Sequence, residues 1–195
     1  MDKIKMLISH KHKFITIDVP KTGTTSINQT LKPFLGKNDF SCKMSQKLGM
    51  RHATYGDCIG NFPGFEHYFS FAFVRNPWDR MVSYYFFRKC NDVVKIDKNI
   101  SFEEVIKTFQ PPNQYSFLKH FGENSFIGRF ENLQEDFDII CDKIGIPHQQ
   151  LPHNNKTKHK HYTKYYDDKT REIVAERFAK DIEYFGYKFG DLSNL

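Results

Sequence analysis

Three short runs of hydrophobic residues in the chain predict buried β-strands. They cover residues 14–19, 69–74 and 125–130, and they are rich in β-branched and aromatic side chains. Segments with helical signals separate and follow them. Near-continuous apolar runs are typical of strands covered on both faces, as in parallel sheets. We therefore expect an α/β fold, a three-layer domain with a mainly parallel central sheet flanked by helices.

Polar residues with capping preferences mark where the helices begin and end. Ser101 and Glu104 form the S-x-x-E pattern of a capping box, which opens a helix. Asn76 is a strong N-cap, and Pro77 suits the first helical position after it. The remaining predictions are a short helix after Thr54, a helix over residues 131–144, a long C-terminal helix that begins at residues 167–168 and ends at Gly186, and a loop over residues 36–51.

A short turn rich in hydroxyl groups joins the first predicted strand to its helix. Either Thr24 or Thr25 is suited to cap that helix, since a hydroxyl accepts a hydrogen bond from a first-turn N–H group. Such a turn directs free N–H groups and the positive end of the helix dipole at one point, which favours phosphate or sulfate. The alternative is a Thr-rich cap beside a solvated lysine. The candidate binding residues are Lys21, Thr22, Gly23, Thr24, Thr25 and Ser26.

A second strand-to-helix junction also carries a cation. Arg75 ends the second predicted strand, and Asn76 begins the helix that follows. Ser83 comes seven residues after Asn76, which is nearly two turns, or roughly 10 Å along the axis, so it projects from the same face. A guanidinium and a hydroxyl that converge there would hold a phosphate. The alternative makes Arg75 a surface ion-pair partner of Asp79 and Ser83 an ordinary helical serine.

Composition narrows the class of partner. The chain has 195 residues, which suggests a single domain over residues 1–195. Its net charge of +6 favours an anionic partner, which is a nucleotide, an acidic acceptor or nucleic acid.

No apolar run has the length of a membrane span, and the N-terminus is not a convincing signal peptide. Four scattered cysteines without a C-x-x-C pair suggest reduced thiols, so we expect a cytoplasmic protein without a metal site.

Together the two junctions resemble the sulfotransferase superfamily that uses 3′-phosphoadenosine 5′-phosphosulfate (PAPS). Residues 73–85 are most similar to the carbohydrate-type branch, sulfotransferase family 2, and later segments of the chain agree with it. The resemblance implies that the three-layer α/β domain is P-loop-like. It also implies that residues 21–26 hold the 5′-phosphosulfate and that Arg75 and Ser83 hold the 3′-phosphate.

The resemblance also implies a basic C-terminal loop that contacts the cofactor. Thr157, Lys158 and Lys160 are the candidates in this chain, and the alternative is a solvated loop. The implied enzyme moves a sulfuryl group from PAPS to a hydroxyl acceptor, a carbohydrate, and leaves adenosine 3′,5′-bisphosphate. Lys21 is the candidate to neutralise the bridging oxygen as the bisphosphate departs. Fixed cations then take the place of Mg²⁺, so no metal is required.

The acceptor hydroxyl needs a general base, and His52 is the first candidate. It lies between the two cofactor motifs, and histidine titrates near the operating pH. The alternative is a surface histidine beside its neighbour in the sequence, Arg51. His67 is the second candidate, and Glu66 and Asp57 also stay open.

Two functions of other classes stay open. One is a nucleotide kinase or NTPase, against which the position of Lys21 before Gly23 argues, because the pattern G-x-x-x-x-G-K-[ST] is absent. The other is a non-enzymatic, basic nucleic-acid-binding protein, which the charge permits but no recognised motif supports. The sulfotransferase interpretation predicts a hydroxylated small molecule or glycan as partner, and no nucleic acid.

Overall fold

The computed structural model describes residues 6–37, 39–41, 53–61, 64–90, 99–152 and 160–191. The chain divides into two compact units. The first contains Met1–Val74, Ser116–Asn154 and Ser193–Leu195, and the second contains Arg75–Tyr115 and Asn155–Leu192. The expectation of a single domain over residues 1–195 stays a prediction.

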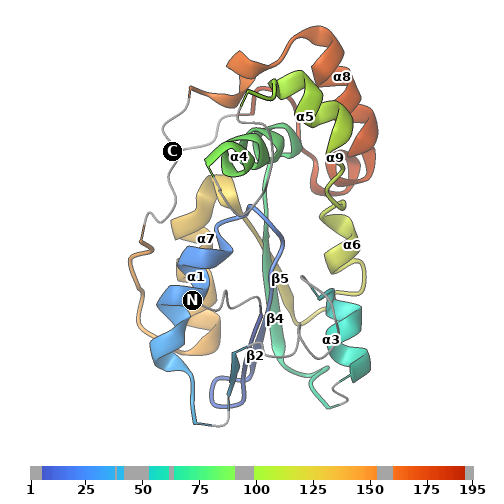
Figure 1. Ribbon diagram of the computed structural model, residues 1–195. Helices are drawn as coiled ribbons and strands as arrows, with labels where there is room; N and C mark the ends of the chain where they lie inside the picture. The colour runs from blue at the N-terminus through green and yellow to red at the C-terminus, as the bar shows by residue number, and fades with distance from the viewer. Residues whose placement is uncertain are drawn as a thin grey trace. The chain divides into compact units, whose positions relative to one another are not determined.

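A mixed five-stranded sheet forms the centre of the first unit (Figure 1). Its strands lie in the order β3-β1-β2-β4-β5. β2, β4 and β5 run parallel, whereas β1 pairs antiparallel with both β2 and β3. The carboxyl ends of β2 and β4 are therefore neighbours. The bounds are β1 Leu7–Ser9, β2 Phe14–Ile17, β3 Phe40–Ser41, β4 Phe69–Val74 and β5 Ser125–Arg129.

The sequence predicts the three parallel strands but neither of the antiparallel ones. The predicted loop over residues 36–51 is wrong at Phe40–Ser41, which forms β3. Strands of two or three residues are too short to show a hydrophobic period of their own. β1 is placed by pairing with β2 across a tight turn, in which Lys13 adopts a left-handed φ of 52°.

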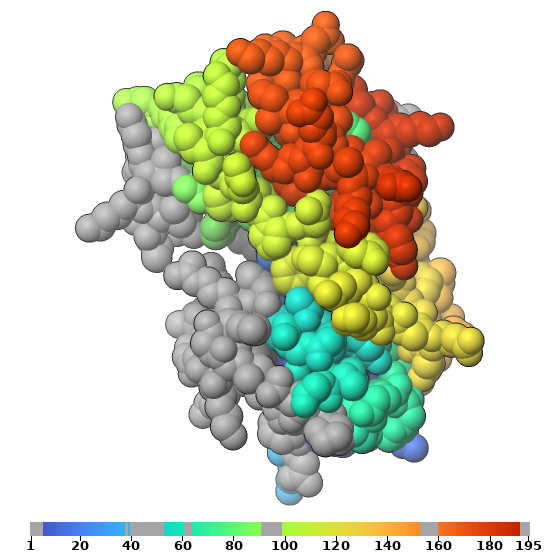
Figure 2. Space-filling model, turned by 90° about the vertical axis from the view of Figure 1, so that its right-hand side faces the viewer, coloured from blue at the N-terminus to red at the C-terminus, as the bar shows by residue number. Residues whose placement is uncertain are grey.

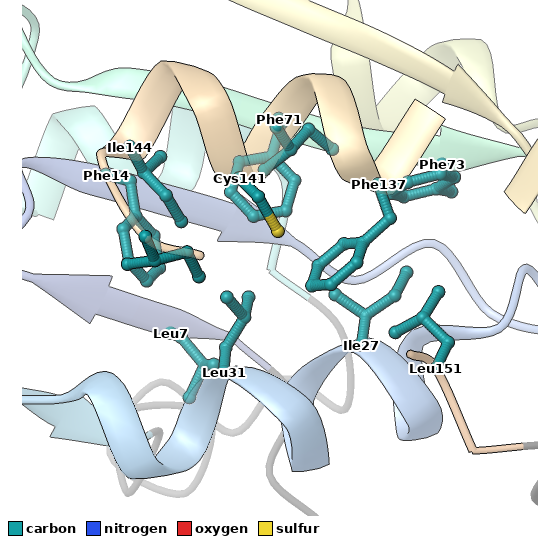
Figure 3. Close-up of a cluster of buried hydrophobic side chains, with 12 residues drawn as sticks. Leu7, Phe14, Ile27, Leu31, Phe71, Phe73, Phe137, Cys141, Ile144 and Leu151 are labelled. Atoms are coloured by element: carbon teal, nitrogen blue, oxygen red, sulfur yellow. The ribbon is translucent and has the colours of Figure 1, made fainter. Parts of the chain in front are cut away.

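Helices cover both faces of the sheet and confirm the three-layer α/β prediction. α1 and α7 lie on one face, and α3 and α6 lie on the other (Figure 1). Between the sheet and the first pair, Ile27 and Leu31 of α1 pack with Phe137 and Ile144 of α7 (Figure 3). The bounds are α1 Thr24–Leu31, α3 Tyr55–Asn61, α6 Tyr115–Leu118 and α7 Leu133–Ile144.

The second unit is built from helices around a core that is rich in aromatic side chains. The predicted capping box is confirmed, with both Ser101 and Glu104 engaged. α5 and α8 lie side by side on one face (Figure 2), where Arg177 of α8 donates hydrogen bonds to carbonyl groups at the end of α5. The bounds are α4 Pro77–Cys90, α5 Phe102–Thr108, α8 Asp168–Arg177 and α9 Ala179–Phe185.

The predicted long C-terminal helix is two helices. It begins after Asp167 and ends at Gly186, as predicted. Between α8 and α9, however, Phe178 leaves the helical conformation, with φ −110° and ψ 25°, and its side chain is buried in the core. No glycine or proline marks this break, so the sequence pattern runs through it. None of the helices in the described ranges combines the length and hydrophobicity that a bilayer crossing requires.

Candidate functional site

The turn between β2 and α1 is shaped by two residues in the left-handed region. Lys21 has a φ of 72° and Gly23 a φ of 83°. Gly23 is the N-cap of α1, so the prediction that Thr24 or Thr25 caps this helix is wrong. The helix begins earlier because the carbonyl of Gly23 already accepts hydrogen bonds from the N–H groups of Ser26 and Ile27. A cap residue without a side chain offers no acceptor of its own to the first-turn N–H groups.

Two internal hydrogen bonds hold this turn in shape. The buried Thr22 donates its hydroxyl to the carbonyl of Val19 at 2.8 Å. The side-chain amide of Asn28, from α1, donates to the carboxylate of Asp18, just beyond β2, also at 2.8 Å. Both Asp18 and Asn28 are buried. The strand and helix that flank the turn are thereby joined, and the Thr22 hydroxyl serves the turn itself.

Gly23 is required by packing as well as by conformation. A Cβ atom at this position would lie 3.1 Å and 3.3 Å from the two Cδ atoms of Leu133 and 3.4 Å from Phe130. The turn therefore packs against the start of α7. Lys21 and Thr24 are partly exposed and Thr25 is exposed, whereas Ser26 is buried. An anion at this turn would meet backbone N–H groups, the hydroxyl of an exposed threonine and one lysine.

The second junction, in the second unit, is anchored from several directions. Asn76 caps α4 as predicted, since its Oδ1 accepts a hydrogen bond of 3.1 Å from Trp78 N. Arg75 is 6% exposed and its Nε donates to Asp79 at 2.8 Å. The alternative of a surface ion pair is therefore wrong in one respect, because the pair exists but is buried.

Ser83 lies on α4 and is partly buried. No residue in the ranges that the structure describes forms a hydrogen bond with its hydroxyl. A serine hydroxyl left without a protein partner is suited to a ligand or to water.

The two cation-bearing motifs belong to different units. Lys21 follows β2 in the first unit, and Arg75 opens the second unit directly after β4. β2 and β4 are adjacent parallel strands. Ligands of parallel α/β sheets bind beyond the carboxyl ends of the strands. That the two motifs share one cleft stays a prediction.

Several predicted residues fall outside the described ranges. These are the candidate base His52 and the loop residues Thr157 and Lys158. Lys160 is described and exposed, and its backbone N–H donates to Tyr165 at 3.1 Å.

The other candidates for the base make separate local contacts, which for His67 is the packing of its ring against Tyr68. The Asp57 carboxylate accepts hydrogen bonds from the N–H and hydroxyl of Thr54, and the Thr54 hydroxyl caps α3 in return, as predicted. Glu66 accepts one from Gly64 N, and His67 is exposed. Among the residues that the structure describes, no three His, Cys, Asp or Glu side chains form a group that could hold a metal ion.

Sequence reasoning misses two buried polar residues beside Arg75. The side chain of Gln114 is hydrogen-bonded to the Arg75 backbone, and the carboxylate of Asp181 holds Gln114. Burial raises the pKa of Asp181, although two backbone N–H groups and the charge of Arg80 oppose that rise. Gln114 lies two residues after a pair of prolines and Asp181 lies within a predicted helix, so no local pattern singles out either residue.

A family model and a named relative agree on one family. The family model described as "Sulfotransferase family" matches residues 5–188. A protein from Archaeoglobus fulgidus named "Uncharacterized protein" is 33% identical over 99 residues, covering 44% of this chain and 74% of its own length. Carbohydrate sulfotransferase 14 of Danio rerio is 24% identical over 230 residues, which cover 93% of this chain. The chain spans 62% of the length of that Danio rerio protein.

The fold has a solved counterpart. The crystal structure of mouse sulfotransferase SULT7A1 complexed with PAP aligns with a TM-score of 0.63 over 94% of this chain and 87% of the mouse chain. The two sequences are 13% identical, so this likeness concerns the fold.

Proposed function

This chain belongs to the sulfotransferase family, and we propose that it transfers a sulfuryl group from PAPS to a hydroxyl group of a carbohydrate. The observation that carries the proposal is the turn at residues 21–26, where a glycine-capped helix N-terminus and Lys21 stand beyond a parallel strand. The mouse structure complexed with PAP and the carbohydrate sulfotransferase of Danio rerio support the donor and the acceptor class.

At the donor end, the turn would bind the 5′-phosphosulfate. The backbone N–H groups of residues 22–25 and the Thr24 and Thr25 hydroxyls would donate to phosphate and sulfuryl oxygens. In the transfer, the bond between sulfur and the bridging phosphate oxygen breaks, and a bond forms between sulfur and the acceptor oxygen. Lys21 would stabilise the charge that develops on the bridging oxygen of the departing adenosine 3′,5′-bisphosphate.

At the nucleoside end, Arg75 and Ser83 would bind the 3′-phosphate. Guanidinium groups match phosphate geometry, and the Ser83 hydroxyl on α4, the helix that follows Arg75, adds a neutral donor. The ion pair with Asp79 holds the Arg75 side chain before a ligand arrives. Thr157, Lys158 and Lys160 would contact the bound cofactor. Fixed cations would supply the charge that Mg²⁺ supplies in other transferases.

The proton of the acceptor hydroxyl would pass to His52. A histidine is neutral at physiological pH and can accept it, which raises the nucleophilicity of the acceptor oxygen. His67 is the second candidate.

Isothermal titration calorimetry tests the proposal against its two alternatives. We expect tight binding of adenosine 3′,5′-bisphosphate that does not depend on Mg²⁺. A preference for Mg·ATP would instead support a nucleotide kinase, and salt-sensitive binding of oligonucleotides alone would support a nucleic-acid-binding protein. Incubation with PAPS carrying labelled sulfur and a panel of sugars then identifies the acceptor, and transfer only to non-carbohydrate hydroxyls would contradict the acceptor class.

A further inference from the structure

The side-chain amide of Gln114 forms hydrogen bonds with both the backbone N–H and the backbone carbonyl of Arg75. Gln114 Oε1 accepts a hydrogen bond of 2.9 Å from Arg75 N, and Gln114 Nε2 donates one of 2.8 Å to Arg75 O. The Gln114 side chain is fully buried. One amide thus satisfies the two backbone groups of the residue that directly follows β4, where the pairing of the sheet has ended.

Gln114 is itself held by a buried carboxylate. The two oxygens of Asp181, on α9, accept hydrogen bonds from the successive N–H groups of Gln114 and Tyr115 at 2.8 Å and 2.9 Å. Asp181 is fully buried, and the positive charge of Arg80 acts on it. Buried networks of this kind have little freedom, because each unpaired group would carry a desolvation cost.

The network fixes the direction in which the side chain of Arg75 extends from the backbone. The hydrogen bonds to Gln114 restrain the main chain at this position, and the ion pair with Asp79 restrains the side chain at Nε. A guanidinium that is already held in place loses less conformational entropy when it binds a phosphate. Gln114 itself is not expected to bind the ligand, because both polar atoms of its amide are hydrogen-bonded to the backbone of Arg75.

We propose that Gln114 is a positioning residue that sets the selectivity for the 3′-phosphate by fixing the backbone of Arg75. This inference rests on the proposed function, in which Arg75 binds that phosphate. If the role of Gln114 were purely structural, replacing this residue would lower the free energy of unfolding and would weaken the binding of all nucleotides by the same factor. A positioning role lowers the preference for a nucleotide that carries the 3′-phosphate over one that lacks it.

Calorimetry on the full chain measures that preference as the ratio of the dissociation constants of adenosine 5′-phosphate and adenosine 3′,5′-bisphosphate. Gln114→Met keeps the length of the side chain and removes both hydrogen bonds. We expect the ratio to fall about ten- to a hundredfold, the range of one charge-assisted hydrogen bond, while the affinity for adenosine 5′-phosphate changes far less. Gln110→Met is the matched control, because Gln110 is exposed in the same connecting segment, and it should keep the wild-type ratio.

A second variant covers the case in which Gln114→Met does not fold. Gln114→Asn keeps the amide on a side chain that is one methylene shorter, so both hydrogen bonds to Arg75 are weakened but not removed, and an intermediate fall in the ratio is expected. If Arg75→Ala removes the preference for the bisphosphate, a folded Gln114 variant that keeps the wild-type ratio of dissociation constants would overturn the inference. If Arg75→Ala leaves the ratio unchanged, or the wild type shows no preference, the assignment of the 3′-phosphate site fails and the inference fails with it.

Discussion

Arg75 Nε donates a hydrogen bond of 2.8 Å to a carboxylate oxygen of Asp79, and the two side chains are only 7% and 4% exposed. Removing one partner of a buried pair leaves the other charge uncompensated. We therefore expect Asp79→Ala to lower the free energy of unfolding by about 3–5 kcal/mol and to weaken the binding of adenosine 3′,5′-bisphosphate. Urea denaturation and calorimetry measure the two effects.

The chain provides a matched control for this pair. Lys107 and Glu103 have the same i, i+4 spacing on α5, but both side chains are nearly half exposed. Water and salt screen an exposed pair, so Glu103→Ala should change stability far less than Asp79→Ala. Equal losses in the two variants would contradict the conclusion that burial makes the Arg75–Asp79 pair important.

The candidate general base can be identified by separating turnover from cofactor affinity. His52→Ala is expected to lower kcat about 10²- to 10⁴-fold, the usual contribution of a general base, and to leave the affinity for adenosine 3′,5′-bisphosphate unchanged. His67→Ala, which alters an exposed histidine packed on Tyr68, should leave kcat intact. The reverse result would move the base to His67.

Gly23 should tolerate no side chain. Its φ of 83° costs an L-residue about 1–2 kcal/mol, and a Cβ atom would press on Leu133 and Phe130. Gly23→Ala is therefore expected to destabilise the protein by at least about that amount and to lower cofactor affinity. Thermal unfolding with and without adenosine 3′,5′-bisphosphate measures both effects.

Gly60→Ala is the control for that substitution. Gly60 lies in α3, and apart from its two chain neighbours and the backbone of that helix, none of the residues that the structure describes has an atom within 4 Å of the place that a Cβ atom would take there. Alanine also favours helices over glycine by up to about 1 kcal/mol. The stability of this variant should stay the same or rise. If Gly23→Ala behaved like Gly60→Ala, the left-handed turn would not be needed for the phosphate site.

Local signals account for what the sequence predicts correctly. β4 is apolar at every position except Ser70, and Asn76 with Pro77 marks the start of α4, so a few adjacent residues determine each element. Signals of this kind also locate both cation-bearing junctions. The cap of α1 is mispredicted because the left-handed Gly23 competes with two good hydroxyl caps, and propensity alone does not rank them.

The remaining features depend on contacts between distant parts of the chain. Asp181 meets Gln114 across 67 positions, and Gln114 meets Arg75 across 39. No hydrophobic period or motif records such a pairing. Likewise, the break at Phe178 follows from burial of its ring in the core of the second unit. Tertiary packing decides these points, and the local sequence is compatible with other outcomes.

Gly128 in β5 makes room for an aromatic ring in the neighbouring strand. It is the register partner of Phe73, and a Cβ atom at Gly128 would lie 2.5 Å from the Phe73 ring. Gly128→Ala should cost about 1–3 kcal/mol through overpacking. Combined with Phe73→Leu, it should cost less than the sum of the two single changes, with a coupling of about 0.5–3 kcal/mol. Additive losses in urea denaturation would contradict direct contact as the cause.

The carboxylate of Asp39 makes the stability of the first unit depend on pH in the acid range. Its carboxylate accepts hydrogen bonds from the Ser9 hydroxyl at 2.6 Å and from His10 N and Gly36 N at 2.8 Å and 2.7 Å. Burial alone would raise the pKa of Asp39, but these hydrogen bonds outweigh it and hold the pKa below the usual 3.8. A lowered folded-state pKa stabilises the protein above the unfolded-state value, and that contribution is lost as the pH falls through the folded-state pKa.

Asp39→Asn removes this contribution, because an amide retains one acceptor oxygen and adds donors where donors already point. We expect a loss of about 1–3 kcal/mol in the free energy of unfolding at pH 7, and the difference from wild type should shrink as the pH falls below 3.8. Urea denaturation from pH 7 to pH 3 follows the difference. Glu123→Gln, at an exposed carboxylate of the same unit, should track the wild type throughout. A loss for Asp39→Asn that stays constant across this range would show that shape, and not the ionised carboxylate, is what the turn requires.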